Sequence, residues 1–328
     1  MATYKGISGF NIKSLATDPS NLLEGEIWYN STSGTLKVAP LVGSWSAGGN
    51  LNSARDYNKG CGIQTAALTV AGHPAGSSGD LVEEYDGSAW TEQTGLGTAR
   101  YNGGLFGVQT SAIFASGRVS GVSPGLLTAA EEYGGSSWTA VNSINTARSY
   151  LSGMGTTAAG LIALGAAPRS TAVGNVEEYN GTSWAEQTDV STTRKAGAGG
   201  GIQTSAVVFG GNAPPPTSSN ATEEYDGSAW TAGGTMVTAI YRNMGSTNAT
   251  ANTAVLNFGA QNPAITAAST RYDGTAWATS PSLGTARGNG AGAGTATTAL
   301  CMGGNTPGDT NATEEYTSVT TAQTVTTS

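Results

Sequence analysis

One short unit recurs along most of this sequence, and its clearest copy is Glu-Glu-Tyr-Asp-Gly-Ser-Ala-Trp at residues 223–230. Related units occupy residues 83–90, 131–138, 177–184 and 270–277, while residues 314–316 carry only its beginning. The tryptophans recur at steps of 45, 48, 46, 46 and 47 residues, at Trp45, Trp90, Trp138, Trp184, Trp230 and Trp277. A fixed period of this size predicts a repeat architecture. Because one array accounts for nearly all 328 residues, we expect one large domain rather than two.

Each repeat contains four strand signals, here called a to d in chain order. In the fourth repeat they are residues 194–200 for strand a, 206–209 for b, 222–225 for c, and a start near Trp230 for d. Asp226-Gly227 between c and d predicts a tight hairpin with positive φ at both residues. Four antiparallel strands per repeat of this length are typical of a propeller blade.

Counting the a strands after each tryptophan gives six blades. The sixth has strands near Arg287, Leu300 and Tyr316 but no following tryptophan, and residues 42–48 supply the missing fourth strand from the front of the chain. Pairing the two ends would close the ring and remove the open sheet edges. The predicted fold is therefore all-β, a six-bladed propeller over residues 42–316.

Residues 1–41 lie outside the repeats and are predicted to form an attachment arm. Residues 25–29 and 35–38 are expected to be the strands of a hairpin, and the chain before Glu24 to be extended. Trp28 and Tyr29, which belong to no repeat, are the candidates for contact with another subunit. The tail, residues 317–328, is rich in Thr and Val, which leaves an extra strand or a frayed end as alternatives.

The repeat resembles the kelch repeat over roughly residues 42–316. The resemblance rests on paired glycines after strand b (Gly210-Gly211 and Gly303-Gly304), on the Tyr before the turn, on the Trp after it, and on an Arg that opens strand a. Gly165-Ala166 and Gly259-Ala260 keep only one glycine each. The resemblance implies a β-propeller in which residues near the arginine position line a ligand pocket.

The sequences of the repeats and of residues 25–38 resemble virion proteins of tailed phages, particularly marine ones. Residues 25–38 are Gly-Glu-Ile-Trp-Tyr-Asn-Ser-Thr-Ser-Gly-Thr-Leu-Lys-Val. That resemblance implies a propeller displayed on the surface of the phage particle as a fibre, tail-tip or head-decoration component. Residues 1–41 would dock on other virion proteins, and homo-oligomerisation, for instance as a trimer, is left open. The expected function is non-enzymatic recognition of a host-surface glycan or protein, and a virion module without ligand is the second hypothesis.

Arginines open strand a in five of the six repeats, and two roles are open for them. They could form a basic ring that binds carboxylate or phosphate, or a structural pair with the Glu-Glu of strand c. In the fifth repeat both positions change together, to Ile240 and Thr270-Arg271, which favours the pair. A distance argument opposes it, because the arginine is expected at the start of its strand and the glutamates at the end of a parallel one. The candidate ligand-binding residues are Arg55, Arg100, Arg148, Arg194 and Arg287, with Arg118 and Arg169 from the b–c loops.

The b–c loops differ in every repeat, whereas the a–b and c–d turns are short and similar. They are residues 73–80, 118–130, 167–175, 212–221, 261–268 and 305–312. Diverse loops on a rigid scaffold are the usual place for binding, so we expect recognition on that face, with unselected drift of the loops as the alternative.

Composition narrows the remaining function classes. The net charge of −8 argues against nucleic acid, and the chain has no apolar run that could span a membrane and no signal peptide at its start. The lone His73 argues against a metal site or a Ser-His-Asp triad, so we expect no cofactor. Cys61 and Cys301 are expected to be buried free thiols rather than a disulfide. A glycan-cleaving enzyme is the third hypothesis, which a convergent carboxylate pair at the channel mouth would favour.

Overall fold

The computed structural model describes residues 12–73, 79–215 and 217–326. The chain divides into two compact units, Met1–Ser44 together with Thr317–Ser328, and Trp45–Tyr316. The boundary lies three residues later than predicted, and the tail belongs to the N-terminal unit. Each unit is described by itself below.

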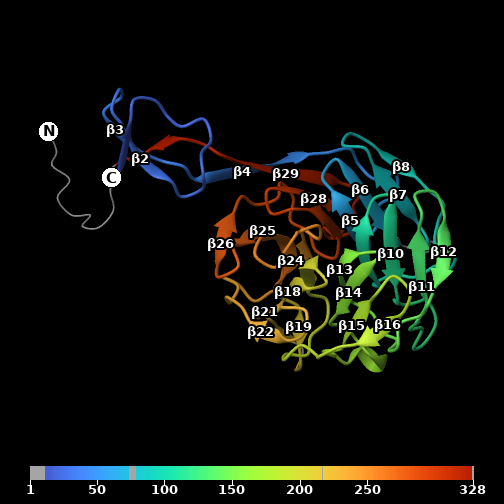
Figure 1. The fold of residues 1–328 in the computed structure, drawn as a ribbon. Coiled ribbons are helices and arrows are strands. Elements are labelled where there is room, and N and C mark those ends of the chain that lie inside the picture. Colours follow the sequence, from blue (N-terminus) through green and yellow to red (C-terminus); the bar gives the residue numbers. More distant parts are fainter. Residues whose placement is uncertain (1–11, 74–78, 216, 327–328) are drawn as a thin grey trace. The chain divides into compact units, whose positions relative to one another are not determined.

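The described residues between Leu41 and Thr320 form six four-stranded sheets, of which the first five lie wholly within the second unit (Figure 1). The first three sheets are β5 (Lys59–Ile63), β6 (Ala66–Val70), β7 (Val82–Tyr85) and β8 (Trp90–Glu92); β9 (Gly104–Val108), β10 (Ser111–Ala115), β11 (Ala130–Tyr133) and β12 (Trp138–Val141); and β13 (Ser152–Thr156), β14 (Ala159–Ala163), β15 (Val176–Tyr179) and β16 (Trp184–Glu186). The other three are β17 (Ala198–Ile202), β18 (Ser205–Phe209), β21 (Thr222–Tyr225) and β22 (Trp230–Ala232); β23 (Met244–Gly245), β24 (Val255–Gln261), β25 (Ile265–Tyr272) and β26 (Trp277–Ser280); and β27 (Ala291–Gly294), β28 (Thr298–Met302), β29 (Thr313–Thr320) and β4 (Leu41–Ala47). A short hairpin of β19 (Asn212–Ala213) and β20 (Thr217–Ser218) and a 3-10 turn, η1 (Pro168–Ser170), lie in b–c loops.

The repeat frame predicted from the sequence agrees with these strands, except at strand a. In the fourth repeat, β18, β21 and β22 lie within one residue of the expected positions, but β17 begins at Ala198, four residues after Arg194. The residues between Arg194 and β17 form hydrogen bonds with loops, such as the Lys195 amide with the Asn212 carbonyl, instead of the continuous hydrogen-bond pattern of a sheet. Beside β29, the sixth sheet has the end of β4, where the Gly48 amide donates to the Thr313 carbonyl at 3.0 Å.

The predicted c–d turn is wrong in its type. Gly227 has a φ of +94°, but Asp226 is not left-handed, and four residues rather than two separate β21 from β22. The Asp226 carboxylate closes this loop by accepting the Ser228 and Ala229 amides, at 2.8 and 2.9 Å. Asp226 therefore contributes its carboxylate as a hydrogen-bond acceptor within the turn, and only Gly227 has a positive φ.

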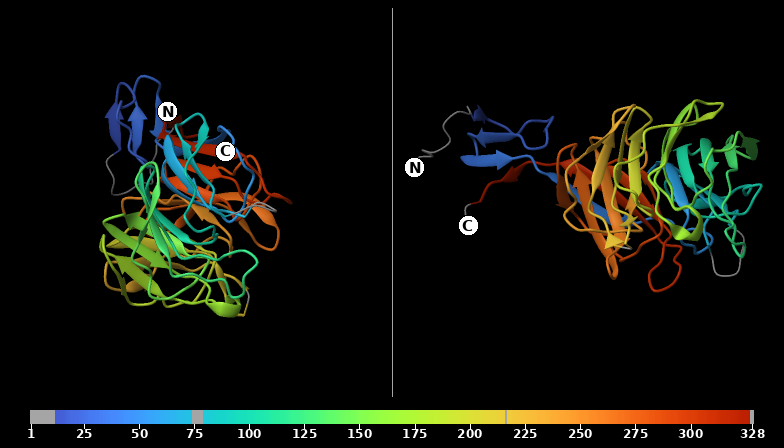
Figure 2. Two further views of the ribbon diagram at one scale, coloured as in Figure 1. Left: turned by 90° about the vertical axis from the view of Figure 1, so that its right-hand side faces the viewer. Right: turned by 90° about the horizontal axis from the view of Figure 1, so that it is seen from below.

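The first strands of the six sheets lie side by side in sequence order. Each contacts the next, and β27 contacts β5, while Figure 2 shows the same succession of sheets from two further sides. Their spacing leaves no room for side chains at several positions. A Cβ on Gly60 would lie 2.6 Å from the Gly292 carbonyl oxygen, and one on Gly153 would lie 2.5 Å from that of Leu105. The glycines of strand a therefore permit the close backbone approach predicted for them.

The hydrophobic core lies between neighbouring sheets. One cluster joins Met154 and Leu161 of the third sheet to Val208 and Trp230 of the fourth, and each is at most 8% exposed. Trp230 also packs on the ring of Tyr225, with centroids 4.9 Å apart. The repeating tryptophans thus pack between sheets, as their single structural position predicts. Cys61 and Cys301 are free and buried in two different clusters, and burial raises the pKa of both thiols.

Two kinds of side-chain hydrogen bond, here called latches, connect neighbouring sheets at four of the six junctions. The second glutamate of strand c accepts the hydroxyl of the tyrosine in the next sheet: Tyr133 to Glu84 and Tyr225 to Glu178 at 3.0 Å, Tyr85 to Glu315 at 2.5 Å, and Tyr272 to Glu224. The glutamine of the a–b turn donates to two carbonyls of the preceding sheet. These bonds are Gln109 to Ala67 and Tyr85, Gln203 to Gly160 and Tyr179, and Gln64 to Ala299 and Tyr316. The latches of Tyr85 and Gln64 join the first sheet to the last.

The N-terminal unit is a sheet in the order β1 (Lys13–Leu15), β2 (Ile27–Asn30), β3 (Thr35–Val38) and β30 (Gln323–Thr324). The predicted hairpin is confirmed as β2 and β3. The described chain before Glu24 is not merely extended, because β1 pairs in parallel with β2. Of the two alternatives for the tail, the extra strand is correct, since β30 pairs with β3.

Trp28, predicted to contact another subunit, lies in the core of the N-terminal unit. It is 0% exposed, and its indole nitrogen donates to the Asp18 carboxylate at 3.0 Å. Its side chain is therefore occupied within its own unit. Tyr29 is 39% exposed, and its predicted role in attachment stays a prediction.

The hydroxyl latch can be tested with Tyr225→Phe. Removing the hydroxyl leaves the half-buried Glu178 without that donor, so we expect the free energy of unfolding to fall by roughly 1–2 kcal/mol. Tyr179→Phe is the matched control, because the equally buried Tyr179 hydroxyl has no hydrogen bond among the described residues. Urea unfolding followed by tryptophan fluorescence measures both variants. Equal losses in the two would show that the latch does not stabilise the junction.

Candidate functional site

Each of the five predicted arginines forms a buried ion pair with the first glutamate of its own strand c. The shortest nitrogen–oxygen distances are 3.0 Å for Arg55–Glu83, 2.5 Å for Arg148–Glu177, 2.8 Å for Arg194–Glu223 and 2.5 Å for Arg287–Glu314, and Arg100 pairs with Glu131. All five arginine side chains are at most 1% exposed. The structural pair is therefore what the structure shows, and none of these guanidinium groups is open to a ligand.

The distance argument against this pair is wrong for two reasons. Arg194 precedes β17 instead of opening it, and Glu223 is the second residue of β21 rather than a residue near its end. Both side chains thus lie at the same end of the sheet. The long arginine side chain then crosses the end of β18 to reach the carboxylate.

In the fourth and sixth repeats the arginine of the ion pair also binds both ends of the b–c loop. Arg194 donates to the carbonyl of Gly210, where the loop begins, at 3.2 Å, and to that of Ala221, where it ends, at 2.7 Å. Arg287 binds Gly303 and Ala312 in the same way, at 3.4 and 2.8 Å. The glutamate meanwhile accepts amides of the d–a segment, such as Ser191 to Glu223 at 2.6 Å. Because these contacts use backbone atoms, the loop between them can vary in sequence.

The Arg–Glu pair and its bonds to the ends of the b–c loop are here called the clamp. The glycine pair after strand b helps to form it. Gly210 and Gly303 have φ of +65° and +64°, and the same left-handed conformation occurs at Ala71, Ser116 and Leu164 in other repeats. This conformation directs the carbonyl toward the arginine, as in the Arg148 Nε bond to Leu164 at 3.2 Å. The pair in the third repeat is therefore Leu164-Gly165, one residue earlier than the sequence comparison placed it.

The fifth repeat replaces the clamp with apolar packing. Ile240, at the arginine position, is 6% exposed and packs in a cluster that contains Met236 and Ala260. Its b–c connection is also the shortest, because β24 and β25 extend to Gln261 and Ile265. Residues 262–264 therefore form a tight hairpin connection in place of the longer loop predicted at residues 261–268.

A ring of backbone hydrogen bonds lies two residues after the arginine position. Its members, here called the inner ring, are Tyr57, Asn102, Tyr150, Ala196, Arg242 and Asn289, and all have φ between 54° and 61°. Each amide donates to the carbonyl of the member before it, and Tyr57 donates to Asn289, with distances from 2.6 to 3.4 Å. None of the six is glycine, so this left-handed conformation is maintained by tertiary bonds rather than by intrinsic preference.

The b–c loops fold onto the inner ring. The residue after each arginine position forms a bridge with the start of its b–c loop, as in Tyr101 with Arg118, Lys195 with Asn212 and Tyr241 with Gln261. The aromatic side chains gather here: the rings of Tyr57 and Tyr101 are 5.9 Å apart, and those of Tyr57 and Tyr150 are 6.0 Å apart. The face that carries the b–c loops, here called the loop face, therefore has an aromatic centre.

Three adjoining hollows lie on the loop face and share Ser170. One of about 460 Å³ is lined by Arg118, Pro124 and Ser149, and one of about 410 Å³ by Thr171, Ala213 and Pro215. The third, about 290 Å³, is lined by Tyr150, Lys195 and Arg242 among others. Of the loop arginines predicted as ligand-binding, Arg118 is half-buried at a hollow, so its role stays a prediction. The side chain of Arg169 lies outside the described residues.

Two carboxylates lie near the inner ring. Burial, and next the charge of Asp309, raise the pKa of Asp56 from 3.8 to about 7, while Arg242 lowers it. Asp56 is 6% exposed. A carboxyl group so enclosed is protonated or shared near neutral pH, but a substrate has little access to it.

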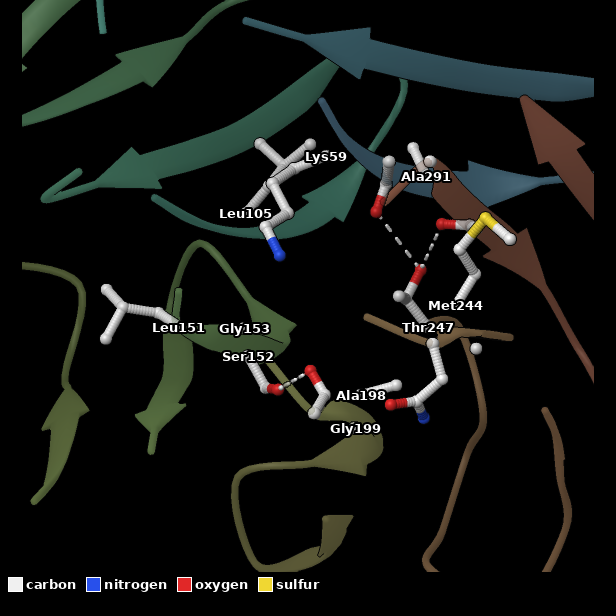
Figure 3. Close-up of a pocket in the computed structure, with 16 residues that line it drawn as sticks. Lys59, Leu105, Leu151, Ser152, Gly153, Ala198, Gly199, Met244, Thr247 and Ala291 are labelled. Atoms are coloured by element: carbon white, nitrogen blue, oxygen red, sulfur yellow. Dashed lines mark hydrogen bonds between the residues drawn. The ribbon is translucent and has the colours of Figure 1, made fainter. Parts of the chain in front are cut away.

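A small cavity of about 40 Å³ lies between the first strands of the sheets (Figure 3). Lys59 points its amino group into it, and Leu105, Leu151 and Met244 line it. Burial lowers the pKa of Lys59 to about 8. The cavity has room for only a few water molecules, so the larger hollows of the loop face are the candidate site.

Comparisons with known proteins bear on the fold alone. No protein-family model matches the sequence, and no curated protein matches it. A solved structure titled "Structure of YjhT" is similar, with a TM-score of 0.65 and 11% sequence identity over 84% of this chain and 99% of that one. At this identity the likeness shows that the fold is all-β and propeller-like.

The described residues contain no helix long and apolar enough to cross a membrane. They also contain no group of three or more His, Cys, Asp and Glu placed to hold a metal ion.

Sequence reasoning missed the residues that line the loop-face centre. These residues lie one or two positions after the arginine position of their repeats, and they are Tyr57, Tyr150, Lys195 and Arg242. Because the residue type at these positions differs from repeat to repeat, no recurring motif marks them. The signal available in the sequence was the position itself, because cationic or aromatic residues occur there in some repeats while the repeats are otherwise similar.

The ion pair predicts opposite outcomes for single and paired substitutions. Glu177→Ala leaves the Arg148 charge buried without its partner, so we expect the free energy of unfolding to fall by about 3–5 kcal/mol. Arg148→Ile with Glu177→Thr copies the fifth repeat and should recover much of that loss. Denaturant unfolding of both proteins gives the comparison. A double variant less stable than Glu177→Ala would contradict the inference that apolar packing can replace the pair.

Asp56 predicts a pH dependence of stability. Because its pKa is raised on folding, the folded state binds the proton more tightly, and stability falls as pH rises from about 4 to about 7. Asp56→Asn should flatten this part of the curve, since each unit of pKa shift is worth about 1.4 kcal/mol. Thermal melting of both proteins across this pH range measures the difference. Parallel curves would show that Asp56 does not titrate in this window.

Proposed function

We propose that this chain is a non-enzymatic binding module: a closed six-bladed, kelch-like propeller that recognises a host-surface glycan or protein through its loop face. The observation that carries the proposal is the clamp. The Arg194 and Arg287 pairs hold both ends of their b–c loops by backbone atoms, and Arg100 and Arg148 hold the start of theirs. The residues between those ends differ in every repeat. Fixed ends with variable centres are what a recognition surface on a rigid scaffold requires.

Closure of the ring is supported by contacts between the first and last sheets. The Tyr85 hydroxyl donates to Glu315 at 2.5 Å, the Trp90 indole to Thr313 at 3.0 Å, and the Tyr57 amide to Asn289 at 2.6 Å. We count six blades, because six sheets succeed one another and the inner ring has one member from each repeat.

We place the module on the surface of a tailed-phage particle, as a fibre, tail-tip or head-decoration component. This setting rests on the resemblance of residues 25–38 and of the repeats to phage virion proteins. Residues 1–41 would dock on other virion proteins, with Tyr29 as an exposed contact, and a homotrimer is one assembly that a displayed fibre component would adopt.

A glycan-cleaving enzyme is the second candidate, and one observation favours it. Asp56 and Asp309 are electrostatically coupled carboxylates near the inner ring, and Asp56 has a pKa of about 7. Binding is the better conclusion because Asp56 is 6% exposed and cannot meet a glycosidic bond without rearrangement. If the parent chain releases reducing sugar from a glycan and the Asp56→Asn variant does not, the enzyme becomes the better conclusion.

Steric blocking tests the binding proposal. The full chain, Thr171→Trp on the loop face and Ala158→Trp in the a–b turn on the other face are compared on glycan arrays and on a panel of bacterial cells. Both sites are exposed and belong to the same repeat. We expect Thr171→Trp to lose most of the binding and Ala158→Trp to keep it. No binding by the folded parent would favour a purely structural virion module.

A further inference from the structure

The third hollow of the loop face combines two cations with two aromatic side chains. Its lining includes Tyr150, Lys195 and Asn212, together with Tyr241 and Arg242, and its volume is about 290 Å³. The residues come from the d–a segments of the third to fifth repeats and from the adjoining b–c loops. The volume lies near the lower end of the range for small-ligand pockets, about 300–1,000 Å³.

Both cations that line this hollow donate to neutral oxygen atoms. Lys195 Nζ donates to the Ser170 carbonyl at 2.6 Å, and Arg242 Nη1 donates to the Gln261 side-chain oxygen at 2.9 Å. Neither forms an ion pair with another described residue, whereas every clamp arginine has its own glutamate. Burial, and next the charge of Arg242, lower the pKa of Lys195. Two neighbouring positive charges that repel each other are stabilised by an anion between them.

The Arg242 guanidinium is held in a fixed orientation. It lies 5.4 Å from the centre of the Tyr241 ring and 5.8 Å from that of the Tyr57 ring. Its Nε and Nη2 make no hydrogen bond with other described residues. A planar guanidinium with two free donors is suited to a carboxylate, which accepts two parallel hydrogen bonds. Asp56, whose pKa Arg242 lowers, is buried and does not line the hollow.

The rest of the lining suits a sugar ring. Tyr150 and Tyr241 offer aromatic surface with a polar tip, and Asn212 offers both hydrogen-bond donors and acceptors. Such groups pack against the C–H faces of a sugar and bind its hydroxyls. A free inorganic anion would use the cations but not the tyrosines.

We propose that this hollow binds a sugar residue that bears a single carboxylate, with Arg242 and Lys195 on the carboxylate and Tyr150 and Tyr241 along the ring. The assignment rests on the proposed function, because it names the part of a host glycan that the loop face would recognise. Arg118, at the adjoining hollow, is then placed near the next residue of the glycan.

Matched sugars test this assignment directly. Glucuronic and galacturonic acid are titrated into the full chain by calorimetry, with glucose and galactose as the neutral counterparts and sulfate as a free anion. We expect the acids to bind about tenfold or more tightly than the neutral sugars, because only the acids accept charge-assisted hydrogen bonds from Arg242 and Lys195. We expect a similar difference from sulfate, because sulfate has no ring to pack against the tyrosines. Equal affinity for acid and neutral sugar, or for sulfate, would overturn the proposal.

Two charge-removing variants locate the site. Arg242→Gln and Lys195→Gln should each reduce acid-sugar affinity about tenfold, while the exposed Lys13→Gln of the N-terminal unit should not change it. Melting curves confirm that each variant is folded. Undiminished affinity in Arg242→Gln would refute the site. Cell binding blocked by Thr171→Trp without acid-sugar binding would refute this inference alone, whereas absence of cell binding would refute the proposed function.

Discussion

The buried Arg–Glu pair is the interaction on which the loop face depends. In each of five repeats the carboxylate of the pair accepts amides of the d–a segment. In four of them, all but the first, the arginine also binds a carbonyl at the end of strand b. A buried pair is weak evidence for stability, because desolvation opposes the Coulomb attraction. Its value here is geometric, since it fixes where a loop leaves the sheet and where it returns. The fifth repeat supports this view, because it has lost the pair and has also lost the long loop.

The inner ring has a related consequence. Six amides and six carbonyls bond to each other around the centre, so the backbone there is satisfied without any side chain. Side chains at these positions are then free to differ, and in this chain they are Tyr57, Tyr150 and Arg242 among smaller residues. The scaffold thus provides a second set of variable positions beside the loops. The hollow with Lys195 and Arg242 lies where the two sets meet.

Much of the fold was predictable because the repeat gives the same signal several times. Strands β18, β21 and β22 lie where the fourth repeat predicts them, and the Tyr–Trp pair marks the c–d turn in five of the six copies. The site was harder to predict. Arg100 and Arg148 have the residue type of a ligand site, but they are structural, while Arg242 and Lys195 lie at positions that look like ordinary variation.

The sequence by itself determined the period and the strand pattern, and the joint change of Ile240 and Thr270 favoured the ion pair without deciding for it. These are local or repeated features, so one chain contains enough copies to reveal them. Only the tertiary structure decided which arginines are buried, how the tail joins β3, and which side chains share a hollow. Those outcomes depend on distances between residues far apart in the chain, which neither periodicity nor composition encodes.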